Sequence, residues 1–63
     1  MASMDWLSLN EVLNDLDEAT VLDLLNKEVE VYKRRTHIMR IHQRYSMLRK
    51  LREREELLAK AAV

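Results

Sequence analysis

Two histidines are the residues of this chain best suited to metal or acid–base chemistry. His37 and His42 are five residues apart, so on a helix they point to different faces, unlike the i, i+4 pair of a helical zinc site. The chain has no cysteine, and the residues near both histidines are mostly cationic, which disfavours a metal ion. We therefore expect two surface histidines, no metal site and no cofactor.

Two hydroxyl groups lie within reach of these histidines in the sequence. Ser46 is one helical turn after His42, and Thr36 is next to His37. Nucleophilic catalysis also needs a group that orients the base, and no carboxylate lies at helical spacing from either pair. A chain of 63 residues offers little concave space for a substrate. We expect no catalytic residues and no enzymatic activity.

Cations in the second half of the chain are the other candidates for a functional site. Lys33, His37, Arg40 and Arg44 are spaced 4, 3 and 4 residues apart, so they share one helix face, and Arg49 falls on a second basic face. A cationic helix face can lie on phosphates. Acidic residues of the first half, or of a second copy, can equally well neutralise it. Lys33, Arg40, Arg44 and Arg49 are therefore candidate contacts either to a protein partner or to phosphate.

The charge distribution makes pairing the central property of the chain. Residues 1–30 hold eight acids and one base, whereas residues 31–63 hold ten bases and three acids, although the total charge is zero. Such an asymmetry between halves indicates self-pairing or a charged partner.

Helices must position these residues, because the composition disfavours strands and tight turns. The chain lacks glycine and proline, and it is rich in leucine, glutamate, arginine, lysine, methionine and alanine. We predict one all-α domain over residues 1–63, with a short helix over about 9–16 and two longer helices over about 18–34 and 37–61. Ser8 and Glu11 have the spacing of a capping box for the first helix, and Asp17 is a good N-cap for the second.

Apolar spacing predicts a seam along the second and third helices. In the third helix the apolar residues are 3, 4 and 3 residues apart, as in a coiled coil, until Arg52 and Glu55 break the pattern. The predicted core or dimer seam consists of Leu22, Leu25, Val29, Tyr32, Ile38, Ile41, Tyr45 and Leu48.

The join between the second and third helices allows two arrangements. One is an unbroken helix from Glu18 to Ala61, and the other is a hairpin with a turn near residues 34–36 and Thr36 as the next N-cap. The lack of Gly or Asn there disfavours a tight turn, but opposite charges favour folding back. We expect the hairpin. Because a chain this short buries a small core and has no disulfide, we also expect it to form a homodimer.

The distribution of apolar residues bears on whether the chain crosses a membrane or is secreted. No run approaches the ~18 apolar residues of a membrane span, and the first residues lack the basic and apolar regions of a secretory signal. We therefore expect a cytoplasmic protein. A membrane-surface helix over residues 38–51 is the least favoured alternative, because its apolar face lacks Trp and Phe.

The stretch from Leu22 to Leu58, which includes LLNKEVEVYKRRTHIMRIHQRYSMLRKLREREELL, resembles small helical proteins of bacteriophages. Together with the length, it looks like the small early accessory proteins encoded in the exo–xis region of lambdoid phages. The resemblance implies a helical, dimeric early accessory protein of a phage, which acts in the cytoplasm of the bacterial host and biases host physiology or phage development by binding a host or phage protein. A nucleic-acid-binding regulator and a scaffold element remain the alternatives.

Overall fold

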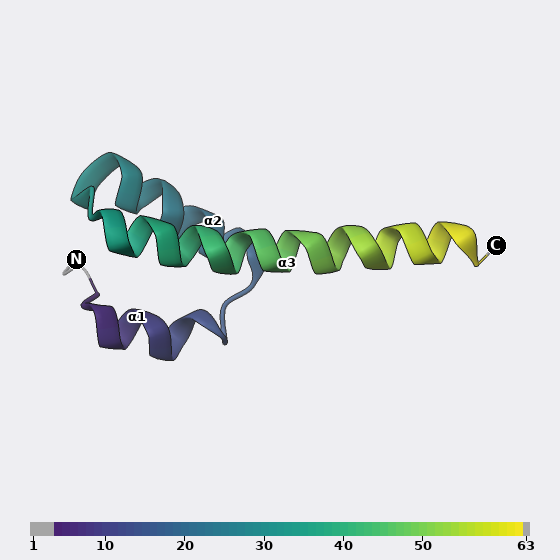
Figure 1. Ribbon diagram of the computed structural model, residues 1–63, viewed down its shortest axis with the longest axis horizontal. Helices are drawn as coiled ribbons and strands as arrows, with labels where there is room; N and C mark the ends of the chain where they lie inside the picture. Colours follow the sequence, from purple (N-terminus) through teal and green to yellow (C-terminus); the bar gives the residue numbers. More distant parts are fainter. Residues whose placement is uncertain (1–3, 63) are drawn as a thin grey trace.

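The computed structural model describes residues 4–62, which contain three α-helices, one π-helical segment and no strand. In chain order they are α1 (Trp6–Leu13), α2 (Glu18–Lys27), η1 (Glu28–Tyr32) and α3 (Arg35–Ala61). Both α1 and α2 pack against the first half of α3, and the second half of α3 extends beyond them (Figure 1). The predicted all-α class, a short helix followed by a helical hairpin, is confirmed.

The first helix begins earlier than its sequence pattern indicated. Asp5 is the N-cap, and its carboxylate accepts a hydrogen bond of 2.8 Å from the backbone N–H of Ser8. Ser8 therefore lies inside the first turn, and the predicted capping box from Ser8 to Glu11 is wrong. The helix ends at Leu13 rather than near residue 16. Because Asp5 accepts from a backbone N–H of the first turn that would otherwise be unpaired, α1 can start one turn earlier than predicted.

The second helix begins where the sequence indicated. The carboxylate of Asp17 accepts a hydrogen bond of 2.8 Å from the backbone N–H of Thr20, and Glu18 in the first turn suits the positive end of the helix. At its other end the backbone widens into η1, where Lys33 donates its N–H to the carbonyl of Glu28. The expected helix over 18–34 is therefore an α-helix followed by a π-helical turn.

A left-handed residue makes the turn of the hairpin. Lys33 has φ of 56°, a conformation that costs a residue with a side chain about 1 kcal/mol. Arg34 is extended and caps α3, which begins at Arg35. The predicted N-cap at Thr36 is therefore wrong, as is the alternative of one unbroken helix. A turn without glycine forms here because other contacts hold its two ends.

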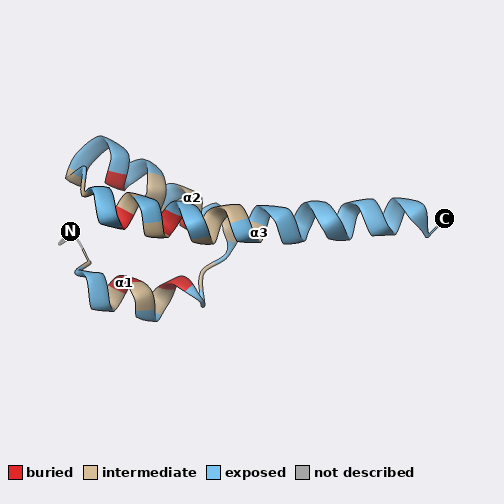
Figure 2. Ribbon diagram, in the orientation of Figure 1, coloured by how far each residue is buried: buried red, intermediate tan, exposed pale blue. Residues whose placement is uncertain are grey.

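The core is small and lies where α1, α2 and the first half of α3 meet. Its fully buried apolar side chains are Leu9, Leu13, Val21 and Ile41 (Figure 2). Six half-buried side chains pack against them: Met4, Leu16, Leu24, Leu25, Tyr45 and Leu48. Each fully buried aliphatic side chain contributes about 1.5–3 kcal/mol.

The second half of α3 takes no part in this core. Every residue from 51 to 62, here called the α3 free end, is exposed. The described residues span 47 × 21 × 19 Å, so the long dimension comes from this projecting helix.

Candidate protein-interaction surface

Two of the four candidate cations are used inside the fold. Arg44 donates from Nε to the carbonyl of Leu13 at 3.2 Å and from Nη2 to the carbonyl of Asn14 at 3.3 Å. These carbonyls are at the negative end of α1, where a cation is stabilising. Arg40 donates from Nε to Oδ1 of Asn10 at 2.8 Å. Both arginines therefore dock α1 on α3.

The other two candidate cations lie apart from this pair. Lys33 is exposed in the left-handed turn. Arg49 is 3.7 Å from the carboxylate of Glu53 and lies over the ring of Tyr45, with 5.9 Å from its guanidinium carbon to the ring centroid. The structure thus does not bring the four candidates together into one phosphate-binding face.

An ion pair between the half-buried Arg34 and the buried carboxylate of Glu28 closes the hairpin. Arg34 donates to the carboxylate of Glu28 from its backbone N–H at 3.1 Å, from Nε at 2.9 Å and from Nη2 at 2.6 Å. Its Nη1 also donates to the carbonyl of Met4 at 2.7 Å. The hydrogen bonds from Arg34 lower the pKa of Glu28 below its usual value, and they outweigh the effect of burial. Sequence patterns gave no sign of this pair.

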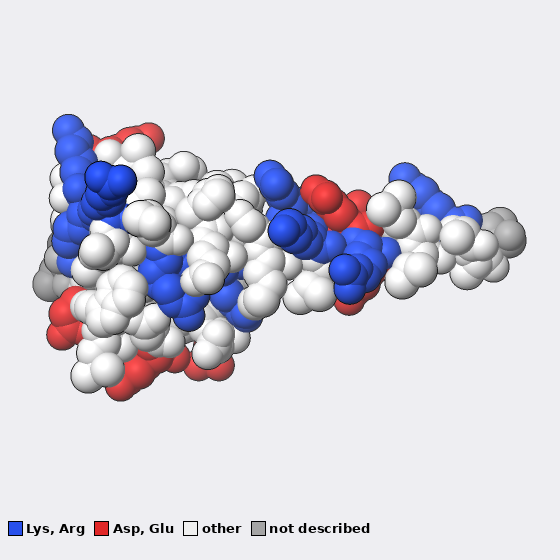
Figure 3. Space-filling model, in the orientation of Figure 1, with Lys and Arg blue, Asp and Glu red and all other residues white. Residues whose placement is uncertain are grey.

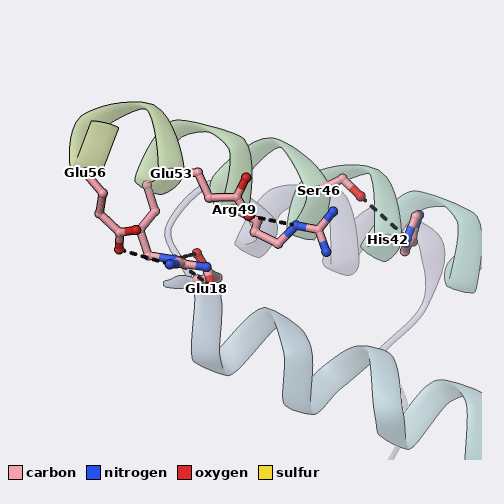
Figure 4. Close-up of polar contacts among 7 residues, drawn as sticks. Glu18, His42, Ser46, Arg49, Glu53 and Glu56 are labelled. Carbon is pink, nitrogen blue, oxygen red and sulfur yellow. Dashed lines mark hydrogen bonds and ion pairs between the residues drawn. The ribbon is translucent and has the colours of Figure 1, made fainter. Parts of the chain in front are cut away.

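A second ion pair joins α3 to the start of α2. Arg52 donates from Nε to the carboxylate of Glu18 at 2.9 Å and from Nη1 to Glu56 at 3.0 Å (Figure 4). These bonds, Glu18 first, raise the pKa of Arg52. The break that Arg52 makes in the predicted seam therefore coincides with the end of the core.

The histidines differ from each other in burial. His42 is exposed, and its Nε2 lies 3.5 Å from the hydroxyl of Ser46 (Figure 4). His37 is 8% exposed, and its ring meets Trp6 edge to face at 5.6 Å. The expectation of a surface histidine is wrong for His37, because α1 starts early enough for Trp6 to cover it. Among residues 4–62 its buried Nε2 has no hydrogen-bond partner.

The predicted seam is only partly a core. Ile41 is fully buried and three seam residues pack against the core, whereas Val29 is 49% exposed and points away from it. The remaining seam residues, Leu22, Tyr32 and Ile38, are half-buried. The π-helical turn explains the exposure of Val29. It changes the rotation of the residues that follow α2, so Val29 no longer falls on the core face.

Apolar side chains line one side of α3 outside the core. Met47 is 44% exposed, Leu51 48% and Leu58 64%. Their spacing of 4 and 7 residues places them on one face, here called the α3 stripe. Leu57, on a neighbouring face, is 65% exposed.

The same side of α3 forms a furrow with α1. One open hollow of about 430 Å³ is lined by Trp6, Thr36, Met39, Arg40 and Gln43. A second, of about 270 Å³, is lined by Asn14, Arg40, Gln43, Arg44 and Met47. Because they share two side chains, we treat them as one feature, the α1–α3 furrow. Sequence spacing gave no sign of it, since α1 supplies one wall.

Comparisons with known proteins add nothing to this geometry. No protein-family model, curated protein or solved structure matches the chain. Within residues 4–62, no group of three or more His, Asp or Glu side chains is arranged to hold a metal ion. None of the helices in that range is both long and apolar enough to cross a membrane. The exposed apolar stripe and the furrow are therefore the features on which a function can be argued.

Proposed function

We propose that this chain is a small non-enzymatic protein that acts through protein–protein contacts and pairs with a second copy of itself. The α3 stripe is the observation that carries the proposal. Its three apolar side chains are exposed and lie at and beyond the end of the core, where α3 extends past α1 and α2. Apolar side chains grouped on one exposed helix face are typical of protein interaction sites.

A second copy is the partner that fits the stripe best. Residues spaced as in a coiled coil are self-complementary, because the same face of another helix can pack into them. The α3 free end contacts α2 through the ion pair of Arg52 with Glu18, but all of its residues are exposed, so its apolar side chains are open to a partner. The α3 free ends of two copies can pack antiparallel. The three-helix part of each copy then lies at an opposite end of the dimer. Such pairing would also supplement a core too small to be very stable alone.

Binding of nucleic acid is the weaker alternative. Arg40 and Arg44 lie together beside α1, but the other two candidate cations lie apart from them, and the total charge of the protein is zero. A phosphate-binding face needs several cations side by side. Lys33 and Arg49 are separated on the surface, and Arg49 is paired with Glu53.

The biological setting of the proposal follows from the resemblance stated above. It is that of a phage early accessory protein in the cytoplasm of the bacterial host, where it modulates host physiology or phage development by contacting a host or phage protein. The absence of any constellation for catalysis in the sequence supports a binding role rather than an enzymatic one.

Affinity capture from a bacterial lysate, with and without nuclease, tests a protein-binding role against a nucleic-acid-binding one. We expect the tagged chain to retain protein after nuclease treatment and at about 0.3 M salt, because apolar contacts are not screened by salt. Retention of nucleic acid alone, lost on nuclease treatment and falling steeply with salt, would overturn the proposal.

The double substitution Lys33→Gln with Arg49→Gln is the matched variant for this capture. It removes two exposed candidate phosphate contacts without touching the arginines that hold α1. Protein capture should be unchanged in this variant. Weaker retention together with a flatter salt dependence would instead indicate phosphate contacts.

A further inference from the structure

The α1–α3 furrow combines exposed apolar side chains with guanidinium groups. Trp6 is 48% exposed, and Met39, on the opposite wall, is 63% exposed. Tryptophan is enriched at the energetic centres of interfaces, and methionine adapts its shape to different apolar partners. One end of the furrow is therefore suited to large apolar side chains of a partner.

The charged part of the furrow is held in place before any partner arrives. Arg40 donates to Asn10 and to Gln43, and Arg44 donates to two carbonyls of α1. A guanidinium group has five N–H donors, so both arginines keep donors beyond those used in these bonds. Because the bonds fix both groups, binding a carboxylate costs little further side-chain ordering.

No carboxylate lines either hollow. On the face shown in Figure 3, Lys and Arg side chains lie between α1 and α3, whereas Asp and Glu side chains lie along the outer edge of α1. The furrow is thus positive, with a negative border along α1. That pattern favours a narrow partner that carries its carboxylates close to its apolar residues.

We infer that the α1–α3 furrow binds a short acidic amphipathic helix of another protein, with its apolar side chains against Trp6 and Met39 and its carboxylates on Arg40 and Arg44. The inference rests on the proposed function and names the class of partner. From residue 36 to residue 47, α3 runs about 16 Å, which corresponds to about 11 residues of a partner helix. Helices that lie in apolar grooves recur in protein recognition.

Two other occupants fit the furrow less well. A nucleic acid would place its phosphates near the acids on the outer edge of α1, and it offers few apolar groups to Trp6 and Met39. A second copy can pair through Leu51 and Leu58 beyond the furrow, and the α3 free end that it would bring carries as many cations as acids, so it is not an acidic partner. A separate acidic helix satisfies both halves of the furrow.

Trp6 is the only tryptophan, so its fluorescence reports directly on the furrow. The probe is a synthetic helix of about 14 residues without aromatic side chains, with leucines at i, i+3, i+4 and i+7 and glutamates on the flanks. We expect a saturable blue shift of Trp6 emission on titration, weakened as salt is raised. The same peptide with lysines in place of glutamates should give none.

Met39→Glu is the informative variant, because Met39 is 63% exposed and outside the core, so the variant should fold as the wild type does. It places a carboxylate in the furrow and should weaken binding of the acidic peptide tenfold or more. Val31→Glu is the matched control, since Val31 is similarly exposed, at 61%, but lies in η1 outside the furrow. This control should bind the peptide as the wild type does.

Several outcomes would overturn the inference. One is that Trp6 emission does not shift with the acidic peptide, or shifts equally with the lysine peptide or with a short DNA duplex. Another is that Met39→Glu and Val31→Glu lose peptide binding equally. A third is a shift that depends on protein concentration alone. The last would mean that a second copy fills the furrow. If the lysate capture still succeeds without nucleic acid, only the furrow inference fails and the proposed function stands.

Discussion

Arg34 donates three hydrogen bonds to the carboxylate of Glu28, six residues earlier, and thereby holds the two ends of the turn between η1 and α3. Lys33, between them, is left-handed without being glycine or asparagine. The ion pair thus stabilises a turn that local conformational preference disfavours. Through the bond from Arg34 to the carbonyl of Met4, the same arginine also fixes the segment that leads into α1.

Substitution of Glu28 should be among the most destabilising single changes in the chain. Glu28→Gln removes the negative charge, so the guanidinium of Arg34 loses the carboxylate to which it donates. We expect a loss of about 2–3 kcal/mol in the free energy of unfolding, measured by urea denaturation. Glu30→Gln is the control, because Glu30 is exposed on the same segment. Equal urea midpoints for the two variants would contradict the role assigned to Glu28.

The protein should become less stable as the pH is lowered, and part of this loss should come from protonation of Glu28. Its pKa is lowered in the folded state from a usual value near 4.5, chiefly by the hydrogen bonds from Arg34. The stabilisation is therefore complete above about pH 5 and is lost as pH falls through the folded-state pKa. Thermal unfolding followed by circular dichroism should show a shallower pH dependence below pH 5 in Glu28→Gln. An unchanged slope would mean that other carboxyl groups cause the loss.

The N-cap of α2 can be tested with two neighbouring aspartates. The hydrogen bonds from Thr20 lower the pKa of Asp17, so its carboxylate is charged where it caps the helix. Asp17→Ala should lower the urea midpoint on the order of 0.5 M, whereas Asp15→Ala, in the preceding turn, should change it little. A larger effect of Asp15→Ala would place the helix start elsewhere.

The docking of α1 should depend on Arg44. Arg44→Ala leaves the carbonyls of Leu13 and Asn14 without their donor and should cost about 1–2 kcal/mol of stability. Trp6 fluorescence in urea is the appropriate measurement, because Trp6 lies on α1. Lys50→Ala removes an exposed charge from the same helix and is the control. If both variants unfold alike, Arg44 acts only through its charge.

The helical class and the fold-back of the chain could be predicted because they depend on composition and on charge. Asp17 was predicted as an N-cap because its pattern is local. Ser8 was predicted as an N-cap because its spacing to Glu11 matched a capping box, but the helix starts one turn earlier, where Asp5 accepts from the backbone N–H of Ser8. Local patterns therefore limited the helix starts to within one turn.

The site could not be predicted in the same way, because its residues are far apart in the sequence. Asn10 meets Arg40, and Trp6 meets His37, only after α1 docks on α3. A π-helical turn has no clear sequence signature, so the exposure of Val29 could not be foreseen. The α3 stripe, in contrast, depends on helical spacing alone, which places Met47, Leu51 and Leu58 on one face. What the sequence could not show was that the core ends before it.

Sedimentation equilibrium tests most directly the claim that the α3 stripe pairs the chain with itself. Across about 5 to 500 μM, we predict a dimer for the wild type and for Ala59→Lys, and a folded monomer for Leu58→Lys. Both variants add one lysine at an exposed position of α3, but only Leu58 belongs to the stripe. A well-folded wild-type monomer at the highest concentration, or an undiminished dimer in Leu58→Lys, would contradict the claim.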